Sequence, residues 1–397
     1  MNFILTRYIF PINEPLILSN RFNFCLDNPR TEEEIAIIKE YLDVSLNSPD
    51  LVYKHYHENR IPIKSTKETT NLLTVESALE GLNKNYSSLD LSVHDFFTKY
   101  RELEPLEKLA RMWVIARYND EGEYQRLQEI ALEESSNGRT GFFLLDKGNP
   151  IIDNSDNLVG FTYFLSLLVH TDKEFYNGQS FILHNDSFTI QHPKVDRFFN
   201  LSVMYFGFMS YSHEIKNLED HWKSFYHIRD ELASVSKKLD GIIDDANQEK
   251  ILFIANLLKV VGNNLKDECA KLVTLVSIIE LLLTHSPDYN RFNIEDSISK
   301  QFRLKASLLV YQNDKSKDIE KVKIRLKEIY SQRSNIAHGN FKSLKDYLRK
   351  EVKKSKEEDI SEDIVLERLS NDLFNFIRAI IEEYIKDRKL VDFLKEN

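Results

Sequence analysis

Residues 276–284 have the sequence Val-Ser-Ile-Ile-Glu-Leu-Leu-Leu-Thr, an apolar run whose only charged residue is Glu280. The run ends a longer stretch, residues 266–284, in which apolar residues recur three and four positions apart, so it predicts a largely buried helix. The same spacing recurs along most of the C-terminal part, at residues 213–239, 246–262, 294–311, 317–338 and 361–386. Residues 241–397 are therefore predicted to form an all-α domain.

Residues 1–240 combine strand and helix patterns. Aromatic and aliphatic side chains alternate along the first 30 residues, which is typical of two or three strands. Thr31 and Glu34 have the spacing of a capping box at the start of a helix. Further segments are expected to be helical at 89–103, 105–118, 121–135 and 157–169, with a hairpin at 181–190. The expected fold class is an α+β N-terminal module followed by an all-α helical bundle.

The charge is unevenly distributed. The chain has 53 basic and 63 acidic residues, a net charge of −10, and residues 241–397 hold 28 of the basic and 27 of the acidic ones. The remaining residues 1–240 therefore carry a net charge of −11. Within the second part, residues 315–356 hold 14 basic and 5 acidic residues, a local charge of +9. This excess either attracts phosphate groups or belongs to a solvated helix surface.

Several protein classes lack their signatures in this sequence. The first ten residues contain Arg7 and run into Pro11, unlike a signal peptide, and no apolar run reaches the roughly 20 residues that span a bilayer. Cys25 and Cys269 lie far apart, which favours a reducing cytoplasm. Phosphate-binding, dinucleotide-binding and serine-hydrolase motifs are missing, so no cofactor is expected. His55-Tyr-His57 has no accompanying cysteine or carboxylate cluster, and no metal site is predicted.

The segment Tyr330-Ser-Gln-Arg-Ser-Asn-Ile-Ala-His-Gly339 places an arginine and a histidine at the end of a basic helix. The spacing of Arg333 and His338 alone is common by chance, but the helix before it and the helix-stopping glycine after it strengthen the signal. Together with 276–284 and 298–309, this segment resembles the ApeA-like branch of the HEPN superfamily, whose signature is Arg-x4-6-His. The resemblance covers about 150 residues and does not extend to residues 1–210.

The resemblance implies a helical bundle that pairs with a second copy and cleaves RNA without a metal ion, in antiviral (phage) defence or as a toxin. Arg333 and His338 are the catalytic residues that it implies, because histidine exchanges protons near neutral pH and arginine neutralises charge on a phosphate. Asn335 and Glu280 are the supporting residues. The RNA contacts expected on the basic helix are Lys321, Lys323, Arg325 and Lys327.

Two rival functions remain open from the sequence. One is a non-catalytic dimeric adaptor that binds RNA or protein through the helical domain, which burial of Arg333 and His338 among apolar side chains would favour. The other is a sensor or scaffold whose work is done by the N-terminal module, which a deep pocket there would favour. If the chain is a ribonuclease, we expect the acidic module to restrain it until a phage or protein trigger binds.

Overall fold

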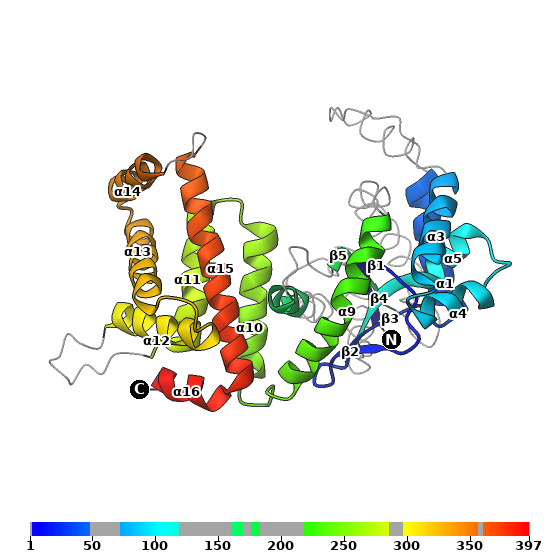
Figure 1. The fold of residues 1–397 in the computed structure, drawn as a ribbon, viewed down its shortest axis with the longest axis horizontal. Helices are drawn as coiled ribbons and strands as arrows, with labels where there is room; N and C mark the ends of the chain where they lie inside the picture. The colour runs from blue at the N-terminus through cyan, green and yellow to red at the C-terminus, as the bar shows by residue number, and fades with distance from the viewer. Residues whose placement is uncertain are drawn as a thin grey trace, which may run out of the picture. The chain divides into compact units, whose positions relative to one another are not determined.

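The structure is a computed structural model and describes residues 2–47, 72–118, 160–169, 176–182, 218–285, 297–355 and 360–396. The chain divides into two compact units, both visible in Figure 1. Unit 1 comprises Met1–Leu158 and Lys173–Asp240, and unit 2 comprises Val159–Asp172 and Gly241–Asn397. The sequence had placed residues 159–172 in the N-terminal module, whereas in the structure they belong to unit 2.

Unit 1 is built on an antiparallel sheet of five described strands in the order β2-β3-β4-β1-β5. The strands are β1 (Asn2–Ile9), β2 (Leu16–Ser19), β3 (Phe24–Asp27), β4 (Trp113–Tyr118) and β5 (Tyr176–Ile182). The first three lie where the alternating pattern predicts strands. The described part of the predicted hairpin contains the end of β5, and its turn at residues 185–186 lies outside the described residues.

The described helices of unit 1 are α1 (Glu32–Asn47), α3 (Leu72–Tyr86), α4 (Leu91–Lys99), α5 (Pro105–Met112) and α9 (Leu218–Asp240). The predicted capping box at α1 is confirmed. The Glu34 backbone N–H donates to Thr31 Oγ1 and the Thr31 N–H donates to the Glu34 carboxylate, each at 3.2 Å. The same carboxylate accepts from the Arg117 guanidinium of β4, which ties α1 to the sheet.

The helix predicted over residues 105–118 is wrong in its second half. The helix α5 ends at Met112, and Trp113–Tyr118 forms β4, which pairs with β1 and β3. Valine, isoleucine and aromatic residues fit a pleated sheet, and pairing on both sides satisfies the backbone of this strand. Helix α3 had not been predicted.

Every described secondary-structure element of unit 2 is a helix, which confirms the all-α prediction. Its helices are α10 (Gln248–Lys259), the π-helix η3 (Val260–Asn264), α11 (Glu268–Leu283), α12 (Ile298–Asn313), α13 (Ile319–Ala337), α14 (Phe341–Lys354), α15 (Glu362–Lys386) and α16 (Arg388–Glu396). Helix α11 packs against α12, α13 and α15, and Figure 1 shows α11 beside α15. Seven of its residues are buried, so it forms the centre of the bundle.

A short helix over residues 160–168 completes unit 2. Its Phe161, Leu165 and Leu168 are buried, and Arg378 of α15 donates from Nε to the Leu167 carbonyl oxygen at 2.8 Å. A Cβ atom at Gly160 would lie 2.5 Å from Asn256 Oδ1 of α10. This glycine therefore permits a close approach between two helices.

Candidate functional site

Arg333 lies in the last turns of α13 and reaches across to α11. Its Nη2 donates to Oε2 of Glu280 at 3.1 Å, and the side chains of Arg333 and Glu280 are 27% and 17% exposed. The guanidinium carbon lies 5.6 Å from the ring centroid of Tyr330, within range of a cation–π interaction. The arginine is thus held from two directions while about a quarter of its side chain stays open to solvent.

Tyr330 is the third member of this cluster, and the sequence had not singled it out. Burial raises the pKa of its hydroxyl, and the charge of Glu280 and a hydrogen bond to that carboxylate raise it further. Its ring packs against Phe302 of α12 at 5.0 Å between centroids. Tyr330 precedes Arg333 by three residues and so lies on the same helix face, the one signal that would have identified it.

One atom of Arg333 has no protein partner. Its Nε is buried and makes no hydrogen bond to any residue that the structure describes. A buried donor without an acceptor costs free energy of about 1–3 kcal/mol. An oxygen from a bound ligand or water would satisfy it.

His338 is the C-cap of α13, and its side chain is exposed. Its backbone N–H donates to Ser334 O at 3.1 Å, so the helix is regular up to this residue. Gly339 follows with φ +70°, which confirms the predicted glycine at the helix stop. Within the described part of the chain, the imidazole has no hydrogen bond or ion pair, so both nitrogens remain available to a ligand.

Arg333 and His338 do not converge within one copy of the chain. An α-helix turns about 100° per residue, so five regular residues separate the two side chains by about 140°. The hydrogen bond from His338 N–H to Ser334 O shows that the last turn of α13 is not frayed. Both side chains are accessible, but they leave the helix in different directions.

Among the described residues, the Asn335 side chain makes no hydrogen bond to Arg333 or His338. Its Nδ2 donates to Oε1 of Gln332 at 3.0 Å, and its carbonyl oxygen accepts from Asn340 N at 2.7 Å. The backbone of Asn335 therefore closes the helix end, and its side chain pairs with a buried neighbour.

The predicted RNA contacts on α13 differ in their surroundings. Arg325 donates from Nε to Asp372 of α15 at 2.7 Å and from Nη1 to Glu328 and to the hydroxyl of Tyr347. Burial raises the pKa of Tyr347 to about 12. Arg325 is thus engaged in joining three helices. Lys323 pairs with Glu320 at 3.2 Å, Lys321 lies 4.0 Å from Asp318, and Lys327 is exposed.

No group of three metal-binding side chains occurs among the residues that the structure describes, and His55 and His57 lie outside them. The described helices also include none that is long and apolar enough to cross a membrane.

Unit 1 contains a cavity of about 450 Å³ beside α4. Lys99 and Arg111 line it and both lie near the ring of Tyr100, with Lys99 Nζ 4.9 Å and Arg111 Cζ 5.1 Å from the ring centroid. Asn28 also lines the cavity and is fixed by hydrogen bonds to the carbonyl oxygens of Phe10 and Trp113. The cavity has the size of a small-molecule site.

No family model, curated protein or solved structure matches this chain.

Proposed function

We propose that unit 2 is a metal-independent endoribonuclease of the HEPN type, in which Arg333 and His338 act on the RNA phosphodiester. The observation that carries the proposal is the cluster at the end of α13. There, Glu280 and Tyr330 hold a partly exposed guanidinium, and five residues later follows an exposed imidazole with no partner among the described residues. The resemblance of the motif to HEPN proteins extends the proposal to antiviral defence or toxin activity.

The chemistry needs a proton acceptor, a proton donor and a positive charge. His338 removes the proton of the ribose 2′-OH, whose oxygen attacks the adjacent phosphorus while the bond to the 5′ oxygen breaks. The leaving oxygen takes a proton from water. Arg333 neutralises the charge that builds on the phosphate oxygens. The products are a 2′,3′-cyclic phosphate and a 5′-OH end.

A second copy of the chain would place an arginine and a histidine at the same phosphate. Since the two side chains of one copy leave α13 about 140° apart, a shared cleft in a homodimer would bring Arg333 of one copy to His338 of the other. The dimer is expected to form through unit 2. This arrangement predicts that neither group works without its counterpart across the interface.

Incubation with total cellular RNA tests the activity. Wild type should produce 2′,3′-cyclic phosphate ends in the presence of EDTA, and His338→Ala and Arg333→Ala should each abolish cleavage with the fold intact. His94→Ala and Arg101→Ala, which change exposed residues of unit 1, are the matched controls and should cleave normally. A requirement for Mg²⁺, or full activity in folded His338→Ala protein, would contradict the proposal.

Mixing the two inactive variants tests the shared cleft. Subunits that re-form dimers at random give heterodimers in half of the cases. Each heterodimer has one intact Arg333–His338 pair, whereas a wild-type dimer has two. The mixture should therefore recover about a quarter of wild-type activity. Light scattering gives the oligomeric state of the same samples. A mixture as inactive as its components would show that the site is not shared.

The rival function is a dimeric adaptor that binds RNA or another protein without cleaving it. The accessibility of Arg333 and His338 favours the enzyme. The cavity of unit 1 is the observation that favours a sensing role for that unit, which would restrain unit 2 until a phage or protein trigger binds.

The restraint is tested by removing unit 1. A chain that begins at residue 241 would lack the buried helix 160–168 of unit 2. A chain that joins residues 159–172 to residues 241–397 through a glycine-serine linker keeps it. If this chain folds and dimerises, its ribonuclease activity should exceed that of the full chain. Equal activity would mean that unit 1 does not restrain the enzyme.

A further inference from the structure

We infer that α14 and its first residue, Phe341, bind a single-stranded segment of RNA beside the proposed cleavage site. The inference takes its ligand from the proposed function, because the substrate there is RNA. It assigns RNA binding to α14, whereas the sequence predicted RNA contacts on α13.

Four of the five lysines of α14 have no acidic partner among the described residues, whereas of the three lysines of α13 only Lys327 has none. Lys342, Lys345, Lys350 and Lys353 are exposed, and none has an acidic partner among the described residues. By contrast, Lys321 and Lys323 of α13 lie near carboxylates of their own helix. A lysine without a carboxylate gains more from a phosphate, because no existing ion pair must be broken. The other two cations of α14 are paired, Arg349 with Glu362 of α15 and Lys354 with Glu351 of α14.

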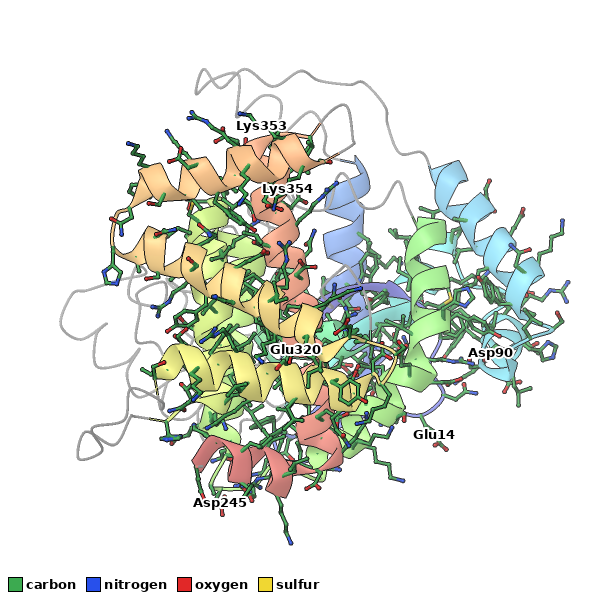
Figure 2. The ribbon with its side chains drawn as sticks, turned by 60° about the vertical axis from the view of Figure 1, so that its left-hand side comes forward. Glu14, Asp90, Asp245, Glu320, Lys353 and Lys354 are labelled. Atoms are coloured by element: carbon green, nitrogen blue, oxygen red, sulfur yellow. The ribbon has the colours of Figure 1, made fainter. Side chains whose placement is uncertain are left out.

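The helix geometry aligns these cations along the outer side of α14. Leu344 and Leu348 are buried, and Lys342 and Lys353 project from the opposite side of the helix. Lys345 and Lys350 lie on either side of the line that joins Lys342 to Lys353. Asp346 is the one acidic residue on this outer side of the helix. From Lys342 to Lys353 the helix rises about 16 Å, so these lysines can contact several successive phosphates of one strand. Figure 2 shows Lys353 and Lys354 at the end of α14 remote from α13.

The apolar side of α14 argues against a membrane as the ligand. An amphipathic helix binds a bilayer by inserting its apolar face. That face is occupied here, since Leu344 and Leu348 are buried within unit 2 and α14 packs on α13 and α15.

Phe341 gives the surface its preference for single strands. It is 53% exposed, begins α14 and follows His338 by three residues. An exposed aromatic ring can stack on a base, but only on one that has left the base stack of a duplex. Phe341 would thus hold an unpaired base close to His338, while the lysines bind the phosphates that follow.

Binding is measured by fluorescence anisotropy with the full chain carrying His338→Ala, so that the RNA is not cleaved. The probe is a labelled single-stranded RNA of about ten nucleotides, and the same strand annealed to its complement is the comparison. Phe341→Ala should weaken single-strand binding at least about fivefold and leave duplex binding unchanged. Lys350→Gln with Lys353→Gln should reduce the slope of log K against log salt by about 1.4.

Lys237→Gln with Lys238→Gln, which removes the same charge from exposed positions of α9, is the control and should leave the slope unchanged. Unaltered affinity and slope in the α14 variants would overturn the inference, even if wild type cleaves RNA. If those variants lose RNA binding but the wild type does not cleave RNA, the binding inference is supported and the proposed ribonuclease activity is contradicted. Equal affinity for single strands and duplexes would overturn the role of Phe341.

Discussion

The pair formed by Glu280 and Arg333 supports a quantitative prediction about stability. A hydrogen bond to a charged group contributes about 1.5–3 kcal/mol, whereas a fully exposed ion pair contributes about 0–1 kcal/mol. With side chains 17% and 27% exposed, this pair lies between the two cases. A double-mutant cycle of Glu280→Gln and Arg333→Lys should therefore give a coupling free energy of about 1–2 kcal/mol. Urea unfolding, followed by circular dichroism, gives the free energy of unfolding of the wild type, of each single variant and of the double variant.

The same double-mutant cycle, measured on cleavage rates, tests whether Glu280 acts by positioning the guanidinium of Arg333. If Glu280 acts by holding the guanidinium, Glu280→Gln should slow cleavage in wild type and have little further effect beside Arg333→Lys, since lysine lacks the planar fork that the carboxylate orients. Tyr330→Phe, which keeps the ring but loses the hydroxyl bound to Glu280, should give a smaller loss of the same kind. A coupling free energy below about 0.5 kcal/mol would refute this account of the pair.

Three further predictions concern the fold. Gly160→Ala should lower the free energy of unfolding by about 1–2 kcal/mol in urea, because the new Cβ would lie 3.1 Å from backbone atoms of Ala255 and Asn256, and this overpacking outweighs a helix-propensity gain of at most about 1 kcal/mol. Glu34 is buried, which alone would raise its pKa, but hydrogen bonds and charge from Arg117 lower the pKa below the usual 4.5. Its stabilising contribution is therefore complete above about pH 4.5 and is lost as the pH falls through the lowered value, so Glu34→Gln should destabilise the protein at pH 7 and progressively less as the pH falls below 4.5. Arg325→Leu should destabilise unit 2 in thermal unfolding and leave RNA affinity unchanged, since Arg325 is engaged with Asp372.

Local signals in the sequence predicted features that depend on local physics. The helix predicted over residues 317–338 matches α13 at Ile319–Ala337, because apolar spacing and the glycine stop both act within a few residues. The capping box of Thr31 and Glu34 is a signal of the same range. Glu280 was expected to support the two motif residues, and it bonds to Arg333.

Features that depend on distant partners could not be predicted. The segment Trp113–Tyr118 continues a helical pattern, and only its pairing with β1 and β3 makes it a strand. Arg325 was expected to contact RNA, yet its side chain bonds to Asp372, which lies 47 residues away. The cavity of unit 1 likewise joins residues of β3, α4 and α5, which no spacing in the sequence relates.

The position of the two motif residues around α13 explains why they have such different surroundings. Ile329 is fully buried and marks the core side of the helix. Arg333 follows it by four residues and lies about 40° from that side, which brings the guanidinium to Glu280 of α11. His338 follows Ile329 by nine residues and lies about 180° away, directed into solvent. One copy of the chain thus stabilises its arginine internally and presents its histidine outward. If both groups act on one phosphate, the arginine that works with His338 must therefore come from another molecule. Arg333 of a second copy of the chain would fill this role.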